Sequence, residues 1–123
     1  MILGLGTDII EVSRVAQKLT KAGFKEKVFS AGEIAFCEKQ AHPEQHYAAR
    51  FAAKEAFLKA TGQGLLFTLD LNAIEVTRNN VGQPGITLHG ELREHALQAG
   101  WKTIHLSLTH LETVANAVVI LES

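Results

Sequence analysis

The chain has 123 residues, of which 46% are hydrophobic, and this composition fits one compact domain covering residues 1–123. Twelve Lys and Arg against thirteen Asp and Glu leave a formal net charge of -1, so no global basic field is available to hold nucleic acid. Cys37 is the only cysteine, which excludes an internal disulfide. The sequence also has no apolar run of the ~20 residues that cross a bilayer, and no signal-peptide pattern. We therefore expect a cytoplasmic protein without nucleic-acid or membrane partners.

The first elements are predicted to be a strand and a helix. Residues Ile2–Ile10 alternate as in a strand, with Asp8 on the side that carries two glycines. Ser13 is predicted to cap the following helix, and Gly23 is predicted to end it. Arg14 then lies away from the apolar stripe of that helix.

Two further helices are predicted in the middle of the chain. Ser30 followed by Glu33 is a capping-box pattern, which predicts a helix that runs to about Gln40. Residues 44–61 are rich in alanine and contain neither Gly nor Pro, so they favour a long helix that ends at Gly62.

The second half of the chain alternates between predicted strands and one helix. Residues 74–77 and 86–88 are predicted to form a hairpin, and residues 91–99 a short helix. Residues 102–109 and 114–121 are predicted to form two antiparallel strands joined by a short loop. These elements indicate an α+β fold, with three or four helices packed on one side of a small, mostly antiparallel sheet.

Two acidic residues are candidates for a metal site. Asp8 on the strand and Glu55 on the long helix could supply two hard oxygen ligands, which is a donor set that Mg²⁺ accepts. The alternative is structural: Asp8 would be a turn former at the strand end, and Glu55 would pair with Lys59 on an exposed helix face.

Basic and glycine residues near the same helix could bind phosphate groups. Arg50, Lys54 and Lys59 could hold a diphosphate, although a solvated basic face would give the same pattern. Gly62 and Gly64 could turn backbone N–H groups toward an anion, although Gly62 could equally be a helix C-cap.

A polar row lies on the predicted strand at residues 102–109. His105, Ser107 and Thr109 share one face of this strand and could bind phosphate or nucleotide edges. An exposed sheet face would have the same composition, so the pattern leaves both interpretations open.

Three sequence blocks carry a resemblance to a known family. They are GLGTDIIE at residues 4–11, RFAAKEAFLKA at residues 50–60 and HLSLTH at residues 105–110. In order and spacing they resemble holo-acyl-carrier-protein synthases, the small trimeric group of 4'-phosphopantetheinyl transferases. The resemblance covers essentially the whole chain.

The resemblance implies an activity and a set of site residues. The 4'-phosphopantetheine group of coenzyme A would pass to a serine of apo acyl carrier protein, with release of adenosine 3',5'-bisphosphate. Asp8 and Glu55 would hold Mg²⁺, and Lys59 would lie near the transferred phosphoryl group. Arg14 would belong to the surface that binds the carrier protein, and a homotrimer would carry its sites at subunit boundaries. The expected coenzyme A contacts are Arg50, Lys59, Gly62, Gly64, His105 and Thr109.

Other functions fit the same residues. A different Mg²⁺-dependent phosphotransferase could use the same acids, and a non-catalytic trimeric module could bind an acidic protein through its basic first helices. Single-stranded nucleic acid binding on the His105 strand face is disfavoured by the net charge and by the presence of only one Trp and one Tyr.

Overall fold

A computed structural model of the chain describes residues 1–63 and 70–123 and has an α+β fold, as predicted. The elements run in the order β1 (Ile2–Glu11), α1 (Val12–Leu19), α2 (Phe24–Val28), α3 (Ala31–Glu38), α4 (Pro43–Thr61), the 3-10 helix η2 (Leu71–Ala73), β2 (Ile74–Arg78), β3 (Pro84–Leu88), α5 (Gly90–Ala99), β4 (Thr103–His110) and β5 (Val114–Glu122). In residues 1–63 and 70–123, none of the helices combines the length and the apolar composition that a bilayer-spanning segment needs.

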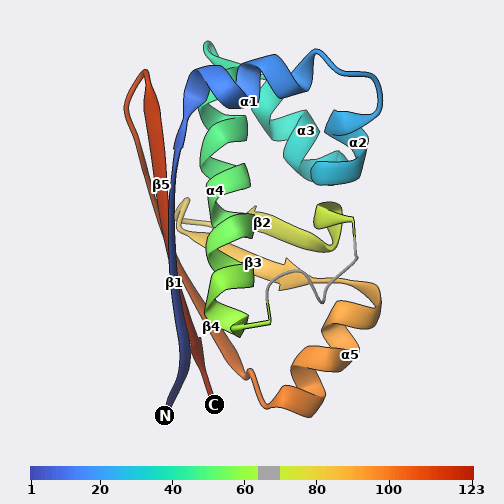
Figure 1. Cartoon of the computed structure of the whole chain (residues 1–123), viewed down its shortest axis with the longest axis vertical. Coiled ribbons are helices and arrows are strands. Elements are labelled where there is room, and N and C mark those ends of the chain that lie inside the picture. The colour runs from blue at the N-terminus through green and yellow to red at the C-terminus, as the bar shows by residue number, and fades with distance from the viewer. Residues whose placement is uncertain (64–69) are drawn as a thin grey trace.

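The strands form two separate antiparallel sheets. In the larger sheet the order is β1-β5-β4, so β5 is central and pairs with both neighbours, as its apolar sequence predicts. The predicted hairpin is confirmed as β2 and β3, but it forms a sheet of its own. The helices lie on one side of the larger sheet, and α4 runs along it (Figure 1).

The two helices with the clearest local signals have the predicted ends. The Ser30 side chain accepts a hydrogen bond from the backbone N–H of Glu33, and the Glu33 side chain accepts one from Ser30, which completes the predicted capping box of α3. Helix α4 ends at Gly62, whose φ of 70° is in the left-handed region that favours glycine at a helix C-terminus.

The predicted ends of the first helix are wrong. Helix α1 begins directly after β1 because the backbone N–H of Val12 donates to the carbonyl of Thr113, and Ser13 therefore lies inside the helix rather than at its cap. The helix ends at Leu19, and Gly23, with φ of 83°, precedes the unpredicted helix α2. Tertiary contacts set these boundaries.

Helix α4 lies unusually close to strand β1. A Cβ atom at Gly4 or Gly6 would overlap the carbonyl oxygen of Ala60 or Ala56, respectively, so only glycine fits this approach. The helix contributes alanines to the contact, and these alanines are fully or almost fully buried. This packing fixes the distance between the strand that carries Asp8 and the helix that carries Glu55.

Candidate active site

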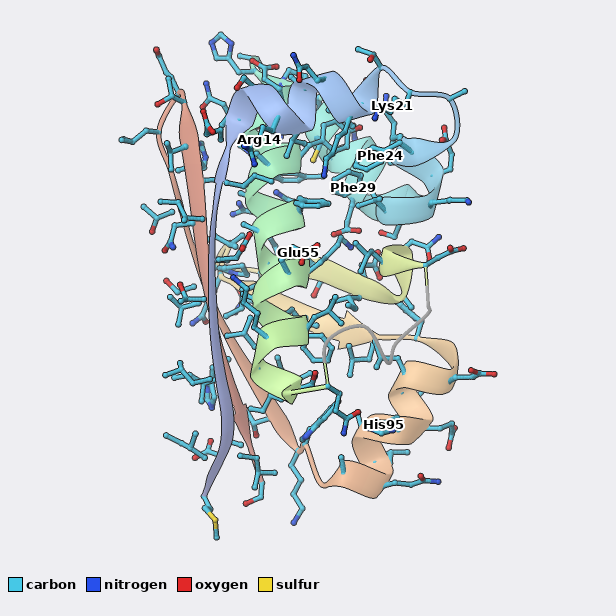
Figure 2. All side chains as sticks on the ribbon, viewed as in Figure 1. Arg14, Lys21, Phe24, Phe29, Glu55 and His95 are labelled. Carbon is cyan, nitrogen blue, oxygen red and sulfur yellow. The ribbon has the colours of Figure 1, made fainter. Side chains whose placement is uncertain are left out.

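Asp8 and Glu55 line one open pocket between β1, α1 and α4. The pocket has a volume of about 500 Å³. In Figure 2, Arg14 is labelled on α1 and Glu55 on α4 below it. The residues around the pocket are Asp8, Ile9, Ile10, Glu11, Arg14, Lys18, Phe51, Glu55 and Val114. The structure therefore brings the two predicted metal ligands together with Arg14.

The position of Asp8 follows from its place in the strand. It pairs with the fully buried Ala117 of β5, so its side chain is on the helix-covered side of the sheet, and only 15% of that side chain is exposed. The ammonium of Lys59 lies 3.1 Å from Asp8 Oδ1 and also donates to the carbonyl of Thr7. Lys59 therefore pairs with Asp8, and the alternative pairing with Glu55 is not the one found.

The carboxyl group of Glu55 lies in an environment that opposes its ionisation. Burial and the negative charge of Asp8 raise its pKa, while the positive charges of Lys18 and Lys59 lower it. The net shift is upward. A divalent cation between the two acids would relieve their repulsion, because it favours the ionised form of both.

The donor set suits Mg²⁺ bound with few protein ligands. Among residues 1–63 and 70–123, no group of three or more His, Cys, Asp or Glu side chains could hold a metal ion. Mg²⁺ commonly uses one or two carboxylates and completes its octahedron with water and substrate phosphates. The Asp8–Glu55 pair fits this mode of binding, with either a diphosphate or water supplying the remaining oxygens.

Lys54 is not part of a basic surface, contrary to the prediction for this helix face. Its side chain is fully buried, and its ammonium lies 2.8 Å from Glu33 Oε1. It also donates to the carbonyls of Leu71 and Ile74. Lys54 is therefore a structural residue that joins α4 to α3 and to the start of β2, and it is not available to a diphosphate.

Arg50 belongs to a second group of side chains, which we call the basic–aromatic cluster: Phe36, His46, Arg50, Arg78 and His110. The guanidinium groups of Arg50 and Arg78 lie 4.2 Å and 4.9 Å from the centre of the Phe36 ring. The rings of His46 and His110 lie 5.2 Å apart, and the His46 ring also contacts Phe36. A pocket of about 240 Å³ borders Phe36, Arg50 and Arg78.

The cluster has features of an anion site, and Arg50 is the one member of it that the sequence analysis predicted. Arg50 is almost fully buried, and its Nε atom has no hydrogen-bond partner among the described residues. An unpartnered buried donor is costly unless a ligand accepts from it. His110 is the last residue of the third sequence block, and His46 lies one helical turn before Arg50. Apart from Arg50, which opens the second sequence block, these two positions were the only local signals for the cluster.

The predicted contacts on β4 lie on the other face of the sheet. Thr109 pairs with Asn116, which pairs with Ile9, so these side chains share the face opposite Asp8. His105 is on the same outer face and lies 2.9 Å from Glu122 Oε1. The structure does not bring these residues to the Asp8–Glu55 pocket within one chain.

The two glycines of the predicted anion loop have different outcomes. Gly62 is the C-cap of α4, as the structural alternative proposed, and its N–H donates to the carbonyl of Lys59. Gly64 lies outside the described residues, so its predicted contact stays a prediction.

Known proteins resemble this chain along nearly its whole length. The family model of the 4'-phosphopantetheinyl transferase superfamily matches residues 4–119. A holo-[acyl-carrier-protein] synthase from Syntrophus aciditrophicus is 44% identical over 99% of this chain and 97% of its own length. The corresponding protein from Koribacter versatilis is 41% identical over 99% of both chains.

Solved structures of such synthases share the whole fold. The Neisseria meningitidis structure has a TM-score of 0.90 at 29% identity and covers 100% of both chains. The Bacillus anthracis structure, solved in complex with CoA (3',5'-ADP), has a TM-score of 0.81 at 34% identity and covers 100% of this chain and 98% of its own. Since the family model spans nearly all of the sequence, the chain belongs to the 4'-phosphopantetheinyl transferase superfamily.

Proposed function

We propose that this protein transfers 4'-phosphopantetheine from coenzyme A to a serine of apo acyl carrier protein in the cytoplasm, with Mg²⁺ as its cofactor. The observation that carries this proposal is the Asp8–Glu55 pair, with Lys59 beside it, in an open pocket of a chain that belongs to this family. Relatives solved with coenzyme A support the choice of donor, since the Helicobacter pylori synthase is 28% identical and was solved in complex with it.

The chemistry is a phosphoryl transfer. The serine hydroxyl oxygen attacks the pantetheine-side phosphorus and forms a new P–O bond, while its O–H bond breaks and the proton is released. The diphosphate P–O bond breaks at the same phosphorus, and adenosine 3',5'-bisphosphate leaves. A Mg²⁺ ion held by Asp8 and Glu55 would supply positive charge to the phosphate oxygens. The Lys59 ammonium lies beside Asp8 and would stabilise the charge that grows on the leaving oxygen.

A homotrimer with sites at subunit boundaries is part of the proposal. Arg50 and Glu55 are five residues apart on α4, so their side chains leave the helix about 140° apart and cannot easily reach one diphosphate. His105 and Thr109 are on the outer face of the sheet, where Leu5 and Ile9 are more than 60% exposed. A neighbouring copy on this face would bury these apolar side chains. It would also bring the coenzyme A contacts of one chain next to the Asp8–Glu55 pair of the other.

The partner surface is proposed to be the basic face of the first two helices. Arg14 is exposed at the rim of the pocket, where its only described ion pair is an exposed one with Glu11 at 3.5 Å. An acidic carrier protein would approach along this face and place its serine at the pocket. The further basic residues of this region are Lys18, Lys21, Lys25 and Lys27.

The test is the intact mass of purified apo acyl carrier protein after incubation with this protein and coenzyme A, with Mg²⁺ or with a chelator. We expect a mass gain of one phosphopantetheine that requires metal and that is absent from a carrier protein lacking its acceptor serine. Carrier binding without a mass gain would favour the non-catalytic module, and a product other than adenosine 3',5'-bisphosphate would favour a different phosphotransferase.

A further inference from the structure

Three acids and two cations line the Asp8–Glu55 pocket, and a third cation, Lys59, pairs with Asp8 from outside the lining. Its carboxylates are Asp8, Glu11 and Glu55, while Arg14 and Lys18 line the pocket and Lys59 reaches it through Asp8. A free divalent cation therefore meets a site whose negative charge is partly offset. We expect the affinity of the pocket for a divalent cation to depend on this charge balance.

The cations of the pocket differ in their partners. Arg14 pairs with Glu11, and Lys59 pairs with Asp8. Lys18 has no ion pair with any acid among the described residues; its ammonium instead lies 5.0 Å from the centre of the Phe51 ring. Since Phe51 is one helical turn before Glu55, this contact keeps the positive charge beside Glu55 instead of leaving it free in solvent.

We propose that Lys18, together with Lys59, makes the binding of a divalent cation at Asp8 and Glu55 depend on a diphosphate ligand. This inference rests on the proposed function. Without a diphosphate, the two ammonium groups offset part of the negative charge of the two carboxylates and so weaken their attraction for the metal. A diphosphate brings its own negative charges, which attract both the metal and the lysines.

The proposal has a thermodynamic consequence that applies in both directions. If the diphosphate raises the affinity for metal by some factor, then the metal must raise the affinity for the diphosphate by the same factor. Lys18 is thus a positioning residue that sets the size of this coupling. It does not need to contact the reacting atoms.

The test is Mn²⁺ binding to the folded protein, measured by electron paramagnetic resonance with and without saturating coenzyme A. A titration of coenzyme A with Mn²⁺ alone corrects for complex formation in solution. For the unaltered protein we expect Mn²⁺ to bind at least about tenfold more tightly when coenzyme A is present, because the diphosphate restores the missing negative charge.

The variant Lys18→Met should change this coupling specifically. We expect Mn²⁺ to bind about tenfold more tightly to this variant in the absence of coenzyme A, since one repelling charge is gone. Lys18→Arg should behave like the unaltered protein. Lys21→Met is the matched control, because Lys21 lies beyond the end of α1 and outside the pocket lining (Figure 2).

The outcomes separate this inference from the proposed function. Equal Mn²⁺ affinity with and without coenzyme A, or an unchanged affinity in Lys18→Met, overturns the role of Lys18 but leaves the metal site intact. If Mn²⁺ binds under neither condition, both the coupling and the metal site of the proposed function are wrong.

Discussion

Lys54 and Glu55 are consecutive residues of one helix, yet their environments differ completely. Lys54 is fully buried with hydrogen-bond acceptors on α3, η2 and β2. Glu55 faces an open pocket, where burial and the charge of Asp8 oppose its ionisation. The Lys54 ammonium is thus paired and buried, while the Glu55 carboxyl group is accessible to a ligand in the pocket.

The difference separates a structural charge from a functional one. A buried ammonium with a carboxylate and two carbonyl acceptors holds three elements in place, and it leaves no capacity for a ligand. A carboxylate held beside a second carboxylate is unfavourable in the free protein, and a bound cation can remove that cost. Substitution of the buried charge should therefore lower stability, and substitution of the pocket charge should lower turnover.

Removal of the buried ammonium should affect stability most. Lys54→Met would leave the Glu33 carboxylate buried without its charge partner, which typically costs about 3–5 kcal/mol of unfolding free energy. Denaturant unfolding measures this change. The double variant Glu33→Gln/Lys54→Met should recover part of the loss, because it removes the uncompensated charge. A Lys54→Met protein as stable as the original would show that the buried pair is not structural.

Removal of a proposed metal ligand, Asp8, should affect turnover and leave stability nearly unchanged. We expect Asp8→Asn to lower the turnover of phosphopantetheine transfer by about 10²-fold, because transition-state charge is less well stabilised. The matched control is Glu11→Gln, which alters an acid of the same pocket that pairs with Arg14. Equal losses in both variants would mean that pocket charge in general, rather than Asp8 as a ligand, supports the reaction.

Reversal of a rim charge should affect only partner capture. Arg14→Glu should weaken the apparent affinity for acyl carrier protein by about tenfold at low salt, with a smaller difference at high salt, because exposed charges are screened. Coenzyme A affinity should not change. Arg93→Glu on the distant helix α5 is the control, and a carrier affinity unaffected by Arg14→Glu would remove this residue from the docking surface.

The smallest effect on stability is expected for Glu75, whose carboxylate accepts a hydrogen bond from the Ser30 hydroxyl. The hydrogen bond from Ser30, and then that of His89, lower the pKa of Glu75 despite its partial burial. An acid with a lowered pKa stabilises the fold above its ordinary value of 4.5, and this contribution disappears as the pH falls. Glu75→Gln should therefore cost about 1 kcal/mol at pH 7 and less below pH ~4.

Thermal unfolding at several pH values measures this difference. Glu94→Gln on the exposed side of α5 is the control and should follow the unaltered protein at every pH. A Glu75→Gln deficit that is independent of pH would mean that the side chain contributes through its packing and not through its charge.

Local signals in the sequence predicted the elements that carry the site. The capping box at Ser30 and the glycine after Thr61 define helix ends through nearby residues, and the alternation in β1 places Asp8 on the helix side. By contrast, α2 has only five residues, and its position depends on Phe24, which packs against Phe29 and Phe51. Such tertiary contacts leave no periodic pattern in the sequence.

The charged residues of α4 were harder to interpret from the sequence. Helical spacing groups Arg50, Lys54 and Lys59, but it cannot show that Lys54 meets an acid 21 positions earlier in the chain. The basic–aromatic cluster likewise collects side chains from α3, α4, β2 and β4. Burial and partners that lie far apart in the sequence require the folded chain.

The most direct test of the contrast between Lys54 and Glu55 uses the variant Glu55→Gln. Its transfer rate is measured at saturating Mg²⁺ and coenzyme A, and its melting temperature is measured on the same protein. Because the pKa of Glu55 is raised, its ionised form destabilises the metal-free fold as the pH rises through that pKa. We therefore predict a melting temperature at pH 7.5 no lower than that of the original protein, together with a turnover about 10²-fold lower. A folded Glu55→Gln protein with near-normal turnover would contradict the account.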